Sequence, residues 1–399
     1  MPSAEPPSPP QLERRVPLRV LVAPDSFKGS LDPLGVASAL RDGWQRARPL
    51  DEIRLIPLAD GGEGTLEAIK ASGGDWIELP VHARDPLGRP MRATFLRRGD
   101  EAVVELASAS GLSRVPADER DALAASTFGT GLVLAAAIGL GARRIVLGLG
   151  GSATTDGGSG LLVALGARFL NEHSEEITPG GGALRELARV DLTEIAPVLH
   201  EVSLTIASDV TNPLLGKRGA AAVYAPQKGA DTAQVNELEA NLAHYVDLLE
   251  AASGRAIRDV PSTGAAGGTT AGLLAIADRF GSLEVRPGVD VVMELCGFDA
   301  TLAESDLVLT GEGRVDEQTA FGKTAFGVAR RAQAANVSCL CFCGGATPEG
   351  ISALAALGAV VVPTVERPQT VDEAMAAGAA PVVRAAERAA RLVSLRADD

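Results

Sequence analysis

Five segments of the sequence combine carboxylates with hydroxyls or cations, and four of them also contain glycine. Two are Asp25-Ser-Phe-Lys28-Gly-Ser and Asp60-Gly-Gly-Glu63-Gly-Thr, and the others span residues 148–158, 208–213 and 311–324. Glycine lets backbone N–H groups approach an anion, carboxylate oxygens suit Mg²⁺, and lysine or arginine neutralises charge on a transferring phosphoryl group. One such segment is common in proteins. Five of them predict a pocket that binds a metal ion and a polyphosphate.

Each of these segments follows a short aliphatic run that predicts a strand. The runs are residues 18–23, 53–58, 144–149, 203–207 and 306–310. Helical patterns occupy about 32–46, 126–140, 233–252 and a stretch from about Thr155. Ligands of open parallel sheets bind at the carboxyl ends of the strands, so we expect these segments to share one edge of a sheet.

The order of predicted elements indicates an α/β protein of two domains. Strands and helices alternate at both ends of the chain, and further buried strands are predicted over 338–343 and 360–365, whereas 76–81, 91–96 and 101–106 predict short strands joined by turns. We therefore expect a discontinuous Rossmann-like or flavodoxin-like parallel-sheet domain from residues 17–76 and 286–399. A second, mixed-sheet α/β domain of residues 77–285 is inserted into it. Residues 1–16 are rich in proline and predict a disordered tail.

Composition excludes several classes of function. The net charge of the 399 residues is −14 with no basic stripe, so nonspecific nucleic-acid binding is not expected. No apolar run reaches the ~18 residues of a membrane-spanning helix, and the first ten residues lack the apolar region of a signal peptide. The four cysteines, at 296, 339, 341 and 343, predict buried thiols rather than disulfides or a zinc site. A cytoplasmic protein is expected, and either a monomer or a homodimer is compatible with the sequence.

Two familiar nucleotide-binding patterns fail on inspection. Gly322-Lys323-Thr324 resembles the end of a P-loop, but Glu317 occupies the position of the required first glycine. Gly148-Leu-Gly-Gly-Ser-Ala matches a dinucleotide fingerprint, but Asp156 would lie in the first turn of the next helix and repel a pyrophosphate. Lys323 is still expected to reach a phosphate or to be solvated.

Seven segments together resemble the type I glycerate kinase family, the bacterial glycerate 2-kinases. They are residues 23–31, 57–65, 105–112, 126–131, 148–158, 208–216 and 310–319, with Gly322-Lys-Thr following the last. Their order covers the chain from about residue 18 to 390. The resemblance implies ATP-dependent phosphorylation of D-glycerate to 2-phosphoglycerate, assisted by Mg²⁺, with in-line phosphoryl transfer in a cleft between the two domains.

The chemistry of a glycerate kinase suggests roles for the carboxylates and cations. Asp60 or Asp316 would accept the proton of the substrate hydroxyl. Asp209 is the leading Mg²⁺ ligand and Glu312 is the second candidate. Lys28 and Arg314 would pair with the glycerate carboxylate or the γ-phosphate; further substrate or phosphate contacts are expected from Asp25, Ser26, Glu63, Gly150, Gly151, Ser152, Asn212, Lys323 and Thr324. Asp25 could equally cap its own loop.

Two other functions are compatible with parts of the sequence. A nicotinamide-dependent oxidoreductase of a small hydroxy acid would use the glycines at 148–153. A non-catalytic organic-acid-binding protein would need no phosphoryl transfer, although the carboxylates Asp60, Asp209 and Asp316 are all present. Release of ADP in the presence of glycerate would distinguish the kinase from both.

Overall fold

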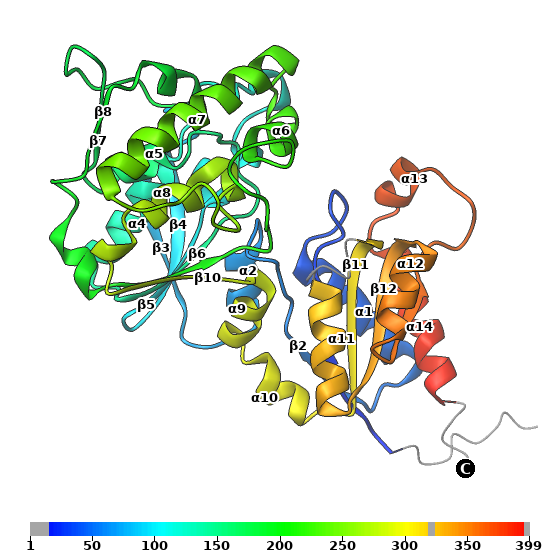
Figure 1. Cartoon of the computed structure of the whole chain (residues 1–399). Helices are drawn as coiled ribbons and strands as arrows, with labels where there is room; N and C mark the ends of the chain where they lie inside the picture. Colours follow the sequence, from blue (N-terminus) through cyan, green and yellow to red (C-terminus); the bar gives the residue numbers. More distant parts are fainter. Residues whose placement is uncertain (1–15, 318–323, 395–399) are drawn as a thin grey trace, which may run out of the picture. The chain divides into compact units, whose positions relative to one another are not determined.

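The computed structural model describes residues 16–317 and 324–394, which form two compact units. The first unit contains residues 16–57, 299–317 and 328–394, and the second contains residues 58–298 and 324–327. The first unit is therefore built from both ends of the chain, as the colours of the ribbon show (Figure 1).

The first unit is organised around a five-stranded parallel sheet. Its strands are β1 (Arg19–Val22), β2 (Glu52–Leu55), β11 (Leu307–Val315), β12 (Ser338–Ala346) and β13 (Ala359–Pro363), in the order β13-β12-β11-β1-β2. The C-terminal β11 pairs directly with β1, in register from Leu307 opposite Val20. The predicted parallel-sheet architecture of the two chain ends is confirmed.

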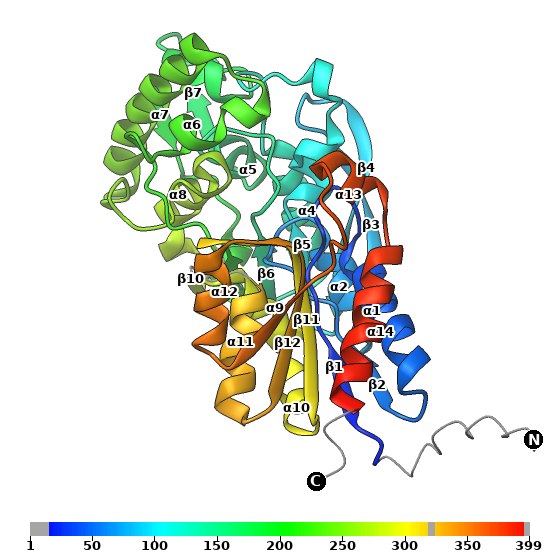
Figure 2. The ribbon, with the colours of Figure 1, turned by 90° about the vertical axis from the view of Figure 1, so that its right-hand side faces the viewer.

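Helices cover both faces of this sheet. Helices α1 (Pro33–Ala47) and α14 (Ala380–Ser394) lie on one face, and α11 (Thr324–Ala335) and α12 (Pro348–Ala355) lie on the other (Figure 2). Helix α1 begins close to its predicted start, and Asp32 caps it, because Oδ1 of Asp32 accepts from the N–H of Gly35 over 2.6 Å. The shorter helices are α10 (Phe298–Ala303) and α13 (Val371–Ala376).

The second unit contains a six-stranded mixed sheet in the order β10-β9-β6-β5-β4-β3. The strands are β3 (Ile77–Arg84), β4 (Pro90–Arg98), β5 (Glu101–Glu105), β6 (Arg144–Gly148), β9 (Ser203–Ala207) and β10 (Ser282–Arg286). Strands β5, β6, β9 and β10 are parallel, whereas β4 is antiparallel to both neighbours. The predicted antiparallel region is thus confirmed. A separate pair, β7 (Arg168–Leu170) and β8 (Arg189–Asp191), has no counterpart among the predicted strands.

The helices of the second unit also fall on two faces of the sheet. Helices α2 (Thr65–Ala71) and α9 (Gly288–Leu295) lie on one face (Figure 1). The other face carries most of the core, packed against α4 (Phe128–Gly139), α5 (Ser159–Ala164), α7 (Thr232–Ser253) and α8 (Thr269–Ala275). The short helices α3 (Ala107–Ser110) and α6 (Ala220–Tyr224) complete the unit.

Several boundaries differ from those expected from sequence. Residues 58–76 and 286–298, assigned by pattern to the first domain, lie in the second unit, where α2 and α9 pack on its sheet. Strand β11 continues to Val315, five residues past its predicted end, because parallel pairing with β12 extends to Ala346. The helix expected from about Thr155 begins at Ser159. The proline-rich segment 1–15 and Lys323 lie outside the described residues.

The four cysteines are buried free thiols, as predicted. Burial raises the pKa of Cys339 and of Cys343 to about 12, so both remain protonated at neutral pH. Within residues 16–317 and 324–394, no helix is long and apolar enough to cross a bilayer.

Candidate active site

Four segments of the second unit meet at the carboxyl edge of its sheet. The loop of residues 60–64 lies against the loop after β6, where the N–H of Gly150 donates to the carbonyl of Gly61 over 3.2 Å. The N-terminal end of α9 approaches the loop after β9, because the N–H of Gly288 donates to Oδ1 of Asp209 over 2.9 Å. The predicted site residues Asp60, Gly150 and Asp209 are thereby gathered in one part of one unit.

Glycines allow these loops to pack backbone against backbone. A Cβ added at Gly150 would lie 2.3 Å from the Cα of Gly62, and one added at Gly288 would lie 2.0 Å from the carbonyl oxygen of Asp60. Non-bonded heavy atoms do not approach each other so closely, so neither position can hold a Cβ in this backbone arrangement. The glycine at 150, predicted to admit an anion, is therefore also required for contact with the neighbouring loop. Gly151, in contrast, is exposed and has a positive φ of 75°.

Asp60 and Asp209 form a pair of neighbouring carboxyl groups. The pKa of Asp209 is raised to about 7, chiefly by burial and also by the negative charge of Asp60, while the N–H groups of Gly288 and Val289 act in the opposite direction. Oδ2 of Asp209 is buried and accepts no hydrogen bond from the described residues. Asp60 accepts from the N–H of Gly62 through Oδ1 over 3.1 Å. Two adjacent carboxylates, one with an unsatisfied buried oxygen, form an oxygen-rich site that favours a cation.

The carboxylate oxygens of this pair are donors of the type that Mg²⁺ accepts. In the described part of the chain, no three His, Cys, Asp or Glu side chains are arranged to hold a metal ion. Mg²⁺ commonly binds through one or two carboxylates together with substrate phosphates and water. Asp60 and Asp209 fit that pattern.

Asp156 has a structural role, and its position differs from the expected one. It is fully buried before α5 rather than within its first turn, and it accepts from the N–H and Oγ1 of Thr127, each over 2.8 Å. The N–H groups of Gly158 and Gly160 also donate to it. Burial raises its pKa despite these bonds. Asp156 thus joins the starts of α4 and α5.

The dinucleotide fingerprint also lacks its structural context. That pattern requires a helix immediately after the glycines, whereas α5 begins only at Ser159. Its glycines serve loop packing instead, since a Cβ at Gly148 would lie 2.4 Å from the carbonyl oxygen of Gly61.

Lys228 is a buried lysine beneath the glycine-rich loop, and the sequence patterns did not identify it. Its side chain is almost fully buried, and Nζ donates to Oγ of Ser152 over 2.9 Å and to the carbonyl of Thr154 over 2.5 Å. Burial lowers its pKa to about 7, and the charge of Asp156 partly opposes this effect. Gly229 and Asp231 follow Lys228, but this stretch matches none of the phosphate-binding patterns, so only the fold reveals the position of Lys228.

Glu105 is a second buried residue to which the sequence analysis assigned no role. It ends β5, and its Oε2 accepts from the N–H of Leu66 at the start of α2 over 3.2 Å. Burial raises its pKa to about 7, and the nearby charges of Glu67 and Glu63 act in the same direction. Its position at the carboxyl end of a strand was the available signal.

The other predicted residues of the second unit are less buried or are used within their own loops. Asn212 donates through Nδ2 to the carbonyl of Arg218 over 2.8 Å, and its Oδ1 accepts from the hydroxyl of Tyr224 over 2.9 Å. Both ends of its amide therefore stabilise the loop. Glu63 is exposed beside Gly151.

The first unit gathers its own set of predicted residues at the ends of β1 and β11. The N–H of Asp25 donates to the carbonyl of Gly311 over 2.8 Å, and Oδ1 of Asp25 accepts from the N–H of Ser26 over 2.6 Å. A Cβ at Gly313 would lie 3.4 Å from the backbone N of Lys28. The loop after β1 therefore runs along the last residues of β11, with the Lys28 side chain exposed.

Glu312 and Arg314 lie within β11 and not in a loop after it, which corrects the predicted strand end. Glu312 is buried at the position opposite Cys343, and its charge acts together with burial in raising the pKa of that thiol. Arg314 is exposed and forms an ion pair with Asp316, with Nε 3.4 Å from Oδ2. Thr324 is buried at the start of α11, in the part assigned to the second unit.

A cavity of about 320 Å³ lies elsewhere in the second unit, between α5, β7 and the β3–β4 turn. Phe128, Val163, Phe169 and Ile177 form its walls, and Arg168 lies among the residues around it. None of the predicted site residues lines this cavity.

Comparison with known proteins identifies the family of the chain. A model of the glycerate kinase family matches residues 20–394. The chain is 42% identical to the glycerate kinase of Halalkalibacterium halodurans over 90% of this chain and 94% of that protein. It is 40% identical to the glycerate 2-kinase of Escherichia coli K12 over 79% and 82% of the two chains.

The fold agrees with this similarity in sequence. A solved structure from Salmonella typhimurium LT2, described as a "putative glycerate kinase 2", superposes with a TM-score of 0.79 and 36% identity. The match covers 95% of this chain and 99% of that one. With a family model spanning nearly all of its described residues, this chain belongs to the glycerate kinase family.

Proposed function

We propose that this enzyme transfers the γ-phosphoryl group of ATP to the 2-hydroxyl of D-glycerate, giving 2-phosphoglycerate and ADP. The observation that supports this function best is the Asp60–Asp209 pair beside the glycine-rich loop after β6, in a member of the glycerate kinase family. An oxygen-rich cation site next to backbone N–H donors suits a metal-bound polyphosphate.

Asp209, together with Asp60, would hold Mg²⁺, and Glu312 of the first unit is the second candidate ligand. Bound Mg²⁺ supplies positive charge to the phosphate oxygens during transfer. The buried, unsatisfied Oδ2 of Asp209 supports this role, because a cation would compensate for its lost hydration.

Cationic and N–H donors would bind the anionic groups of the substrates. Lys28 and Arg314 lie on exposed parts of the first unit, where each could pair with the glycerate carboxylate or the γ-phosphate. The backbone N–H of Gly151 and the hydroxyl of Ser152 would donate to an anion over the loop after β6.

A carboxylate would accept the proton of the attacking hydroxyl. Asp60 and Asp316 are the two candidates. Asp60 lies in the loop after β2, and Asp316 directly follows β11, where it pairs with the predicted substrate contact Arg314. Asn variants at each position separate them: loss of the base lowers kcat by a factor of about 10² to 10⁴ with little change in KM.

The first experiment measures ADP release by the full chain with ATP, D-glycerate and Mg²⁺. Glycerate-dependent ADP release that stops when the divalent cation is chelated is expected. Release that does not depend on glycerate would contradict the proposed substrate, and unchanged release after chelation would contradict the role of Mg²⁺. Phosphorus NMR of the product then identifies the phosphorylated hydroxyl, and 3-phosphoglycerate would contradict the proposed position.

A further inference from the structure

Lys228 lies at the end of the short helical turn Pro226–Lys228, directly under the loop proposed to bind an anion. An ammonium group has three hydrogen-bond donors and no acceptor. When Lys228 is charged, its bond with Ser152 therefore has one possible direction: Nζ donates and Oγ accepts. The hydroxyl proton of Ser152 must then point away from Lys228.

The backbone around Ser152 is held in place independently of Lys228. The N–H of Leu112 donates to the carbonyl of Gly151 over 2.8 Å, and the N–H of Ala153 donates to the carbonyl of Ser110 over 2.9 Å. Ser152 itself forms a β-bridge with Gly111. Because the chain is fixed on both sides of Ser152, the remaining freedom is rotation of its hydroxyl group.

We propose that Lys228 is a positioning residue, which orients the hydroxyl of Ser152 as a hydrogen-bond donor to the anionic substrate group bound at the loop after β6. The inference rests on the proposed function. It gives a role to the side chain of Lys228, which contacts no proposed substrate atom itself. Burial of its charge costs free energy, so a role of this kind would explain why a lysine stands there.

The protonation state of Lys228 matters to this task. Its pKa of about 7 is lowered by burial, and Asp156, on the same loop, is the charge that opposes the shift. Arg120 donates through Nη1 to the carbonyl of Gln227, the residue before Lys228. A neutral amine has a lone pair and can accept from Ser152, which would turn the hydroxyl proton away from the substrate. Substrate binding is therefore expected to weaken as pH rises above about 7.

The test uses Lys228→Met, Ser152→Ala and the double variant of the full chain, with kcat and KM for ATP and glycerate measured from pH 6 to 9. Each single variant is expected to raise the KM of the same substrate about tenfold, the effect of one hydrogen bond to a charged group. The double variant is expected to be no worse than either single one, because both changes remove the same interaction. The control is Lys70→Met, which alters an exposed ion pair on α2 and leaves both constants unchanged.

An unchanged KM in Lys228→Met, or effects that multiply in the double variant, would overturn the inference. If thermal unfolding shows that Lys228→Met does not fold, Ser152→Ala decides the matter, because it keeps Lys228. The rise of KM with pH seen in the wild type must then disappear, and its persistence would contradict the proposal. A wild-type chain without glycerate-dependent ADP release would refute the proposed function instead.

Discussion

Glu105 and Asp209 are two carboxyl groups of the second unit whose pKa values are raised to about 7, and burial is the main cause in both. A carboxyl group with a raised folded-state pKa stabilises the folded protein at low pH. That contribution is lost as pH rises through the folded-state pKa. Both groups therefore make the unit less stable in mildly alkaline solution than it would otherwise be.

Replacement of Glu105 by glutamine removes this pH dependence. Between pH 5 and pH 8 the wild type should lose about 2–3 kcal/mol of unfolding free energy relative to Glu105→Gln, as expected for a pKa near 7 in the folded state and near 4.5 in the unfolded state. Urea unfolding at the two pH values measures the difference. Equal pH dependence of the two proteins would show that Glu105 is ionised normally.

Asp209→Asn tests the proposed cation site without relying on turnover. Mg²⁺ should raise the unfolding temperature of the wild type, since a ligand that binds only the folded state stabilises it. The effect should be lost in Asp209→Asn and retained in Asp278→Asn, a matched change at an exposed carboxylate of the same unit. Retention of the full Mg²⁺ effect in Asp209→Asn would exclude Asp209 as a ligand.

At the scale of elements, the loops of the second unit depend on glycines where one backbone crosses another. Gly150→Ala places a methyl group 2.3 Å from the Cα of Gly62, so the loop after β6 and the loop of residues 60–64 must separate. We expect a loss of about 1–3 kcal/mol in stability, the usual range for overpacking, together with a lower kcat/KM.

Gly139→Ala is the matched control for that change. Gly139 ends α4 in open space, with no atom within 4 Å of an added Cβ. Thermal unfolding and steady-state kinetics of both variants should separate loop packing from the general effect of a methyl group. Wild-type behaviour of Gly150→Ala would show that these loops can move apart freely.

The sequence predicted elements best where local pattern and tertiary pairing agree. Strand β9 has its predicted bounds, Ser203–Ala207, because a buried aliphatic run ends where its hydrogen-bonding partners end. Strand β11 was predicted too short, since Gly311 and Gly313 interrupt the aliphatic pattern while β12 continues to pair with them. The short β7 and β8 depend on each other, and neither has a clear local pattern.

The candidate site was predictable only in part, because some of its residues are placed by tertiary contacts and not by local sequence pattern. Asp60 and Asp209 follow predicted strands, so their approach at a sheet edge could be expected. The burial of Lys228 and Asp156 depends on segments distant in sequence, such as Thr127 and Ser152. No local pattern distinguishes a buried lysine from a solvated one.

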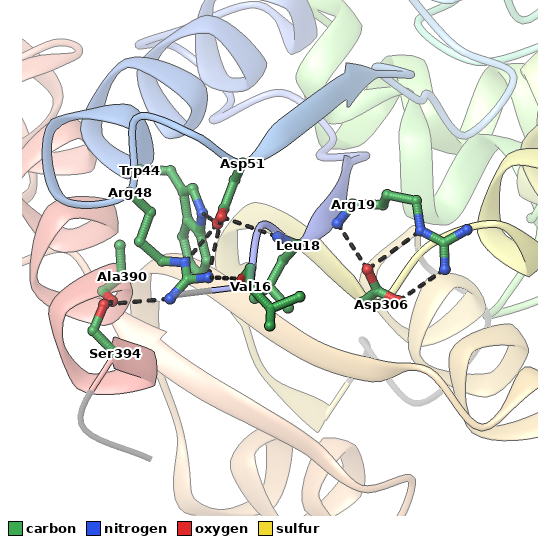
Figure 3. Close-up of polar contacts among 9 residues, drawn as sticks. All are labelled: Val16, Leu18, Arg19, Trp44, Arg48, Asp51, Asp306, Ala390 and Ser394. Atoms are coloured by element: carbon green, nitrogen blue, oxygen red, sulfur yellow. Dashed lines mark hydrogen bonds and ion pairs between the residues drawn. The ribbon is translucent and has the colours of Figure 1, made fainter. Parts of the chain in front are cut away.

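At the scale of the whole molecule, the first unit is closed by contacts between the two ends of the chain. Arg48 and Asp51 form a buried ion pair of 2.6 Å after α1 (Figure 3). Nη2 of Arg48 donates to the carbonyl of Val16, and Nη1 lies 3.5 Å from Oγ of Ser394 in α14. Oδ2 of Asp51 also accepts from Nε1 of Trp44 over 2.8 Å.

Removal of one partner of the Arg48–Asp51 pair should lower the stability of the folded first unit. Asp51→Ala leaves the Arg48 guanidinium buried without its carboxylate, and we expect a loss of about 3–5 kcal/mol in the first unit. The exposed Arg19–Asp306 pair, also visible in Figure 3, is the internal control, and Asp306→Ala should cost about 1 kcal/mol or less. Chemical denaturation of both variants measures the contrast. Equal losses would show that burial does not distinguish the two pairs.

The central position of β1, between β2 and β11, has a consequence for synthesis on the ribosome. Strand β1 is made early, but its neighbour β11 follows only after residues 23–306 have been translated. At about 5–20 residues per second, one edge of the nascent β1 stays unpaired for roughly 15 to 60 s. During that interval the growing chain exposes an aliphatic strand edge that other polypeptides can join. Chaperones that bind nascent chains are therefore expected to protect the N-terminal segment until the last quarter of the protein emerges.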